Sequence, residues 1–127
     1  MTETAWSTRE LDEIAARDEL GVAPRRADGS LTKSRIVWTV RVGDDVYIRS
    51  VNGADGAWYR STRARHEGHV SIGSVDRDIA FAEVDHADSI EDRIDAAYRA
   101  KYGRYSGPVA SITAAKARAT TLRLVPQ

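Results

Sequence analysis

The chain has 127 residues, and its 19 Lys and Arg residues balance its 19 Asp and Glu residues, so the formal net charge is zero. This balance argues against nucleic acid or an anionic membrane surface as partner, because both attract proteins with a basic excess. The absence of cysteine excludes disulfides, thiolate metal sites and a cysteine nucleophile, and we expect a cytoplasmic protein. The first residues have no basic start and no apolar run, so no signal peptide is expected, and no stretch is long enough to span a membrane. The length is usual for one domain, so residues 1–127 are expected to form a single domain.

The first elements are predicted from capping and turn signals. A helix is expected to begin after Ser7, because Ser7 and Glu10 have the spacing of a capping box. The next segment, residues 19–26, is predicted to be a strand that ends near Pro24, since proline donates no ladder hydrogen bond. A turn at Asp28 and the glycine that follows separates this strand from the next.

The clearest hairpin is predicted over residues 36–51. A three-residue loop at 43–45 would pair Val40 with Ile48 and would make one face of the hairpin almost continuously apolar. A two-residue loop would shift the pairing by one residue and mix arginine with valine on both faces. Because one face must be buried, we expect the three-residue loop. The outer face would then carry polar side chains together: Thr39, Arg41, Tyr47 and Arg49.

The middle of the chain is predicted to contain a short helix and two strands. A glycine-rich loop at 53–56 precedes a helix over 57–65, with Trp58 near its start. Strands are expected around 70–72 and 79–84, with a turn over 73–78 between them.

A longer helix is predicted over residues 88–102, where apolar side chains recur at helical spacing: Ile90, Ile94, Ala97, Tyr98 and Tyr102. Residues 105–118 are interpreted as a loop with a helical turn, and 120–125 as the last strand. The order of elements predicts an α+β fold, mainly β. Its six antiparallel strands are expected to close into a barrel, because closure removes exposed strand edges.

No metal ligand and no catalytic residue can be assigned from motifs. The three histidines, His66, His69 and His86, lack the spacing of zinc sites, and we expect each to face solvent. A phosphate-binding loop, a dinucleotide fingerprint and a nucleophile elbow are all absent. A Ser/His/Asp triad assembled in space stays open, although nothing local supports it.

Three groups of side chains are candidates for ligand contact. The arginines of the hairpin's outer face could bind phosphate or carboxylate, but a solvated face with acidic partners is the simpler interpretation. In the helix over 57–65, Arg60 and Arg63 could hold an anion and Trp58 could stack on a ring, or Trp58 could be core. The third group, around Lys101, contains tyrosines that most often serve packing.

Five segments together indicate a family: residues 36–44, 47–50, 56–60, 97–103 and 119–124. In this order and spacing the chain resembles the bacterial family called domain of unknown function twenty-two fifty-five, over almost its whole length. More distantly it resembles the FMN-binding split barrels, including pyridoxamine-phosphate-oxidase-like proteins and deazaflavin-dependent nitroreductases. This resemblance implies a six-stranded split barrel, usually a homodimer, with a cofactor on the outer face of the barrel near the dimer interface.

The resemblance also implies a function: binding of FMN or the deazaflavin coenzyme F-420, with reduction of a small molecule. The expected cofactor contacts are Thr39, Arg41, Arg49, Ser50, Trp58, Arg60 and Arg63. The side chains expected to contact substrate or the partner subunit are Tyr98, Lys101 and Tyr102. The alternative is a cofactor-free barrel that binds a small ligand, or a dimeric accessory protein without catalysis.

Overall fold

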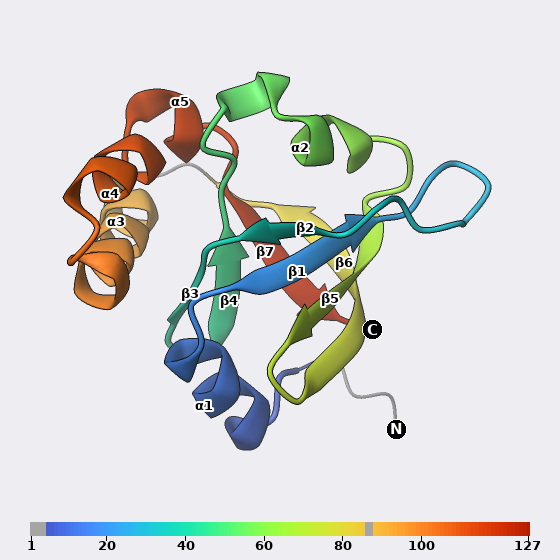
Figure 1. Cartoon of the computed structure of the whole chain (residues 1–127), viewed down its shortest axis with the longest axis horizontal. Coiled ribbons are helices and arrows are strands. Elements are labelled where there is room, and N and C mark those ends of the chain that lie inside the picture. Colours follow the sequence, from blue (N-terminus) through green and yellow to red (C-terminus); the bar gives the residue numbers. More distant parts are fainter. Residues whose placement is uncertain (1–4, 86–87) are drawn as a thin grey trace.

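The structure, a computed structural model, describes residues 5–85 and 88–127. Its centre is an antiparallel sheet of seven strands in the order β2-β1-β5-β6-β7-β4-β3 (Figure 1). The strands are β1 Leu20–Pro24, β2 Arg35–Val37, β3 Thr39–Val42, β4 Asp45–Ile48, β5 Glu67–Ile72, β6 Val75–Glu83 and β7 Leu122–Pro126.

The two edge strands of this sheet are consecutive in the chain. β2 ends at Val37 and β3 begins at Thr39, so Trp38 alone connects the two edges. One residue can join both edges only if the sheet curls round until they meet, which produces a barrel that is split at Trp38 (Figure 1). The predicted split barrel with flanking helices is therefore confirmed. Seven strands replace the predicted six, because Trp38 divides one expected strand into β2 and β3.

The helices are α1 Thr8–Ala16, the 3₁₀-helix η1 Gly53–Asp55, α2 Ala57–Ser61, α3 Asp88–Tyr102, α4 Ser106–Ile112 and α5 Ala115–Arg118. Helices α1 and α2 lie at opposite ends of the barrel, and α3, α4 and α5 cluster at one side (Figure 1). The first and third of the predicted helices are confirmed, whereas the second ends at Ser61 instead of continuing to residue 65. Two short helices occupy residues 106–118, where mainly loop was expected. The predicted turn over 73–78 is too long, because β6 already begins at Val75.

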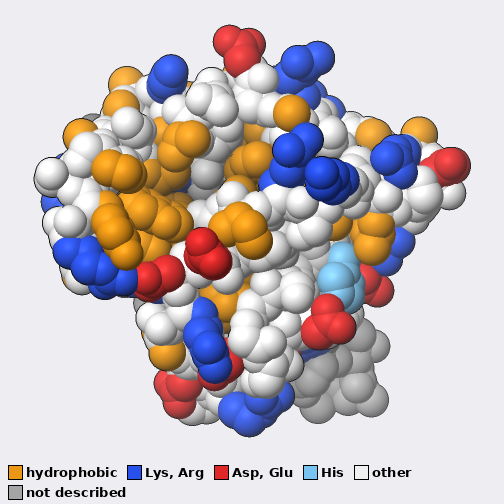
Figure 2. All heavy atoms as spheres, viewed as in Figure 1, with side chains coloured by type: hydrophobic (Ala, Val, Ile, Leu, Met, Phe, Trp, Pro, Cys, Tyr) orange, Lys and Arg blue, Asp and Glu red, His pale blue; other side chains and the backbone are white. Residues whose placement is uncertain are grey.

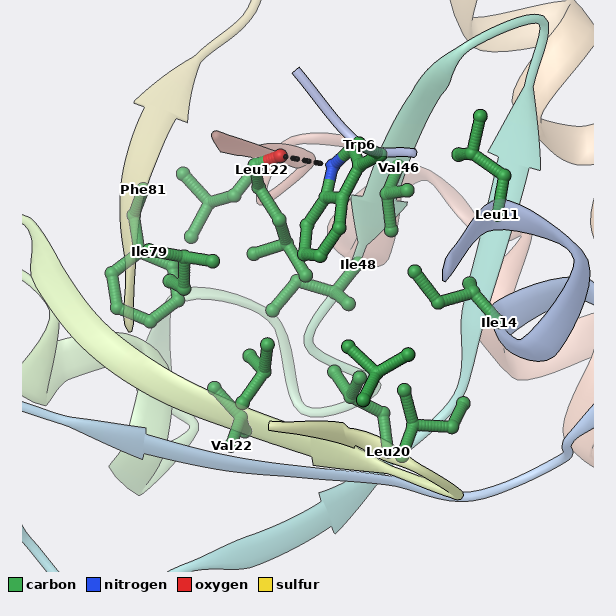
Figure 3. Close-up of a cluster of buried hydrophobic side chains, with 14 residues drawn as sticks. Trp6, Leu11, Ile14, Leu20, Val22, Val46, Ile48, Ile79, Phe81 and Leu122 are labelled. Atoms are coloured by element: carbon green, nitrogen blue, oxygen red, sulfur yellow. Dashed lines mark hydrogen bonds between the residues drawn. The ribbon is translucent and has the colours of Figure 1, made fainter. Parts of the chain in front are cut away.

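The start of α1 is fixed by its own capping groups and by the last strand. The Ser7 hydroxyl accepts from the Glu10 amide at 3.1 Å, and the Glu10 carboxylate accepts from the Ser7 amide at 2.9 Å, which confirms the capping box. The preceding residue, Trp6, is buried and donates its indole N–H to the carbonyl of Leu124 at 3.0 Å (Figure 3). Helix α1 is thus tied to β7 across the barrel.

Apolar side chains are buried on both sides of the sheet. The barrel interior is filled by side chains from the strands and from α1, including Ile14, Val22, Ile48 and Phe81 (Figure 3). A second cluster lies outside the barrel, between β3, β4 and the helices α3 and α4. Its buried members are Val40, Tyr47, Ile94, Tyr98, Tyr102, Val109 and Ile112.

The predicted register of the β3–β4 hairpin is wrong by one residue. Val40 pairs with Tyr47, which leaves a two-residue loop at 43–44. Gly43 has a φ of 61°, as a tight two-residue turn with glycine at its first central position requires. The prediction failed because it assumed that a single face of the hairpin is buried. Here Ile48 packs inside the barrel while Val40 and Tyr47 pack against the helices, so an apolar side chain is needed on each face.

Within the described residues, no helix has both the length and the apolar character needed to cross a membrane.

Candidate functional site

A half-open pocket of about 450 Å³ lies outside the barrel, between β2, the segment after β4, α2 and α4. This volume falls in the range of small-molecule sites, which is roughly 300–1,000 Å³. The walls are largely apolar and come from Ile36, Val37, Trp38, Val51, Trp58 and Ile112. Figure 2 shows hydrophobic side chains gathered around this hollow. Two indole side chains in one pocket of this size suit a planar ligand.

Ser50 contributes a hydroxyl to the lining of the pocket. The residue is 1% exposed and is part of the pocket lining. Its amide donates to the Thr120 hydroxyl at 2.9 Å, which fixes the backbone. Gly56 leaves the space that this hydroxyl occupies, since a Cβ built there would lie 2.3 Å from the Ser50 oxygen. Gly56 therefore gives the Ser50 hydroxyl room beside the pocket.

Arg49 also lines the pocket, but its guanidinium is turned into the protein. The side chain is 0% exposed and donates through Nη1 to Asp95 at 2.5 Å and through Nη2 to Glu91 at 2.7 Å. Its Nε donates to the Thr121 hydroxyl at 3.0 Å, and the two remaining N–H groups reach the carbonyls of Ile112 and Glu91 at 3.1 and 3.3 Å. A guanidinium has five N–H donors, so all five are used within the chain.

The predicted role of Arg49 as a phosphate anchor is therefore not supported by the geometry. A ligand could take a donor from it only by displacing one of these buried partners. The arginine instead holds α3 and α4 against the strand that leads to the pocket.

The hairpin register separates the other predicted anchors. Arg41 shares a face with Val46, opposite to that of Arg49, and pairs at 3.7 Å with Asp12. Thr39 is buried and donates its hydroxyl to the Tyr47 carbonyl at 3.0 Å. Neither side chain lines the pocket. The proposed single basic face formed by the hairpin arginines is thus wrong, because it depended on the mistaken register.

The helix α2 brings Ala57 and Trp58 to the pocket. Arg60 and Arg63 are exposed, neither lines the pocket, and Arg63 lies 5.6 Å from the centre of the Tyr59 ring. Of the seven predicted cofactor contacts, the structure therefore brings together three: Arg49, Ser50 and Trp58.

The three residues expected at the substrate or the subunit interface support the pocket wall from behind. Tyr102 is buried and its ring stacks on Trp38 at 3.9 Å, with a 9° angle between the planes. The Lys101 ammonium donates to the carbonyls of Ile14 and Thr39, both at 2.8 Å. Tyr98 is 0% exposed. None of the three lines the pocket, so their visible role is to position Trp38 and the helices.

The predicted site residues did not include the other residues that line the pocket: Arg35, Ile36, Val37, Trp38, Val51, Asn52, Gly56, Ala57, Pro108 and Ile112. Ile36 was assigned to a hairpin that pairs with β4, whereas β2 pairs with β1 on the other side of the split. No local signal marks the break at Trp38, because an apolar aromatic residue fits equally well in a continuous strand.

His66 and His69 occupy surface positions away from the pocket. His66 is exposed, with a φ of 55°, and His69 in β5 is half-buried between Asp76 and Asp78. Hydrogen bonds that the imidazole donates to Asp78 and Asp76 raise the pKa of His69. His86 lies outside the described residues. No group of His, Asp or Glu able to hold a metal ion is found in residues 5–85 and 88–127.

Replacing Tyr98 by phenylalanine is expected to stabilise the protein. The hydroxyl is fully buried and makes no hydrogen bond of normal geometry to described residues, and burial raises its pKa, slightly offset by the charge of Arg49 and by the nearby Arg49 amide. Removing a buried, unpaired polar group should raise the free energy of unfolding by about 1 kcal/mol. Tyr102→Phe is the matched control. Its hydroxyl donates to the Asp18 carbonyl at 2.6 Å, so its loss should destabilise the fold in urea titrations.

Lys101 gives the stability of the protein a pH dependence. Burial lowers the pKa of Lys101 to about 8, although the charge of Asp18 opposes the shift. Between pH 8 and about 10 the unfolded chain keeps a proton that the folded chain has released, so the free energy of unfolding should rise with pH. We expect a gain of roughly 1 kcal/mol, because partial exposure screens the effect. Urea titrations at pH 7.5 and 9.5 should show this gain, and Lys101→Met should remove it.

The sheet closed at Trp38 and the pocket on its outer side define the class of split-barrel proteins. Within that class, the chain belongs to the family DUF2255, described as uncharacterized protein conserved in bacteria, which it matches over residues 10–124. No curated protein matches its sequence.

Solved structures share the fold at low sequence identity. The chain is similar to the heme storage protein HutZ from Vibrio cholerae, with a TM-score of 0.66 and 11% identity, covering 94% of this chain and 89% of that one. An F420 reductase has a TM-score of 0.54 and 16% identity, covering 91% and 90%. The FAD and heme binding protein from Mycobacterium smegmatis has a TM-score of 0.56 and 18% identity, covering 98% and 67%.

Proposed function

We propose that this split barrel binds a flavin-type cofactor, FMN or the deazaflavin coenzyme F-420, and uses it to reduce a small molecule. The observation that carries the proposal is the apolar pocket that Trp38 and Trp58 line together with Ser50. The names of two similar structures, an F420 reductase and an FAD and heme binding protein, support a cofactor of this type.

The residues of the pocket fit the ring system of such a cofactor. The indoles supply flat apolar surface, and the Ser50 hydroxyl can donate to, or accept from, a polar edge of the ring. A bound flavin or deazaflavin supplies hydride or electron transfer, and the protein supplies binding and orientation. The described lining contains no Asp, Glu, His, Lys or Tyr, so no side chain of the pocket is assigned a proton-transfer role.

Heme fits the same pocket less well. Heme iron needs an axial ligand such as histidine, cysteine, methionine or tyrosine. The described lining of the pocket contains none of these four residue types. The donor set therefore favours a flavin-type ligand over heme, although two of the similar structures are named for heme.

The proposal includes a homodimer of single-domain chains in the cytoplasm. Ile36 and Val51 are 62% and 46% exposed at the pocket, and exposed large apolar side chains that lie together are typical of surfaces that bind another protein or a ligand. A second copy that covers this rim would bury them and would close the pocket toward solvent. Sedimentation of the purified protein tests this part of the proposal, and Ile36→Asp should then shift a dimer toward monomer.

A second candidate function is a cofactor-free barrel that holds a small ligand, or a dimeric accessory protein without catalysis. The observation that favours it is the saturation of Arg49, whose five donors are all used inside the chain. A pocket without a buried phosphate anchor is less suited to a nucleotide cofactor than to a simpler planar molecule.

An absorbance spectrum of freshly purified protein, followed by titration with FMN and with the deazaflavin, tests the proposal. We expect a flavin-like band or saturable binding, and loss of that binding in Trp58→Ala. Arg60→Ala is the matched control, because Arg60 is on the same helix but does not line the pocket. Protein that is colourless and ignores both cofactors would falsify the proposal. A thermal shift with other planar metabolites would then favour the cofactor-free alternative.

A further inference from the structure

The charges around the pocket are distributed unevenly between its floor and its rim. Two arginines are the only charged residues in the described lining: Arg49 at the floor and Arg35 at the rim. Their surroundings differ, because one is fully paired and buried while the other is exposed. This difference restricts the kind of ligand that the pocket accepts and the direction in which it enters.

The floor offers no positive charge to a ligand. Arg49 faces two carboxylates, those of Glu91 and Asp95, so the buried cluster has more negative than positive charge. Arg118 lies 3.7 Å from the second oxygen of Asp95 but also pairs with Asp92 at 3.1 Å, so it leaves no excess of positive charge. An anionic group pushed toward the floor would lose its hydration and find no free donor with a positive charge, which is unfavourable.

The rim, in contrast, carries a free cation. Arg35 is the first residue of β2, and its backbone is held by pairing with Val22 in β1. Within the described part of the chain its guanidinium makes no ion pair or hydrogen bond, and no acidic residue lines the pocket beside it. Figure 2 shows Lys and Arg side chains along one border of the hollow. The planar fork of arginine suits a carboxylate, sulfonate or phosphate group.

From this arrangement we infer that the pocket binds a planar apolar ligand with a single acidic group, which Arg35 holds at the rim while the ring lies inward near Ser50. The inference deepens the proposed function and rests on the same pocket. One free arginine matches one acidic group, so a ligand with several separate acidic groups would leave the others without a partner in this chain. FMN, with its single phosphate, satisfies this condition better than a cofactor with several acids.

The test uses two dyes that share one ring system and carry no redox chemistry. 1-Anilinonaphthalene-8-sulfonate has one acidic group, and N-phenyl-1-naphthylamine lacks it. We expect the full chain to bind the sulfonate more tightly. In Arg35→Gln the Kd for the sulfonate should rise about tenfold while that for the neutral dye stays within about twofold. Arg60→Gln, an exposed arginine of α2 outside the pocket lining, should change neither Kd.

Each other outcome overturns the inference. An equal loss of both dyes in Arg35→Gln would mean that the substitution only disturbs the apolar wall. An equal effect of Arg60→Gln would mean that general surface charge attracts the sulfonate, and absence of binding of either dye would mean that the pocket does not take planar ligands. Failure of the proposed function remains distinguishable, since the dyes need no cofactor chemistry. FMN binding that is unaffected by Arg35→Gln would sink the inference and leave the proposed function standing.

Discussion

Replacing Arg49 by methionine is expected to lower the free energy of unfolding by about 3–5 kcal/mol, because it leaves Glu91 and Asp95 buried without their cation. Both carboxylates are nearly inaccessible, with 3% and 7% of their side chains exposed. Water cannot replace the guanidinium without opening the contact between α3 and the sheet. Urea denaturation followed by circular dichroism measures the loss.

The same measurement on two further variants separates the effect of the positive charge of Arg49 from the effect of its hydrogen-bond geometry. Arg49→Lys keeps the positive charge but offers three donors in place of five, so we expect an intermediate loss. Arg123→Ala removes an exposed pair, 3.8 Å from Asp45, and should cost less than about 1 kcal/mol.

A rescue experiment shows whether the buried charges cause the loss. Asp95→Asn together with Glu91→Gln, added to Arg49→Met, removes the two carboxylate charges that Arg49 faces and should recover a large part of the lost free energy. If Arg49→Met proves as harmless as Arg123→Ala, or if the triple variant is no better than Arg49→Met, the buried cluster is not held together as described. Should Arg49→Met fail to fold, the comparison of Arg49→Lys with Arg123→Ala still shows whether the buried cluster around Arg49 stabilises the fold.

Local chemistry was enough to predict the elements that depend on neighbours in the chain. The capping box of Ser7 and Glu10, the helix at 88–102 and the last strand all follow from spacing within a few residues. The barrel itself also followed, since short strands with inserted helices must remove their exposed edges. Helices α4 and α5 were not predicted. Few of their residues are buried, and helices this short depend mainly on packing against neighbouring elements for their stability.

The site was harder to predict because it depends on which faces of the strands are covered by helices. Arg49 was read as an outward arginine, since nothing local shows that α3 returns to cover that side of the hairpin. One sequence signal could have shown it: Glu91 and Asp95 lie on the same stripe of the 88–102 helix as Tyr98 and Tyr102. Two acids on an otherwise apolar stripe require a buried cation, and a lone arginine at the end of an apolar strand could supply it.

Replacing Gly68 by alanine is expected to lower the free energy of unfolding by about 2–3 kcal/mol. Gly68 lies within β5, where sequence reasoning saw a strand only from residue 70 onward, since glycine weakens strands. A Cβ at this position would lie 2.7 Å from the Ala23 carbonyl and 2.9 Å from the Phe81 ring. The carbonyl belongs to the paired strand β1, so it cannot move away without disturbing the β1–β5 ladder.

A second glycine provides a control in which the same substitution is expected to raise the free energy of unfolding. Gly107 lies in α4, and a Cβ there would meet nothing within 4 Å. Alanine is the better helix former, so Gly107→Ala should stabilise the protein by up to about 1 kcal/mol.

Combining Gly68→Ala with Phe81→Leu separates the clash with the Ala23 carbonyl from the clash with the Phe81 ring. If the ring were the main obstacle, the second substitution would offset much of the loss; because the Ala23 carbonyl is the closer and less mobile neighbour, we expect it to offset little. A wild-type stability for Gly68→Ala alone would mean that β1 and β5 are not held as closely as their register requires.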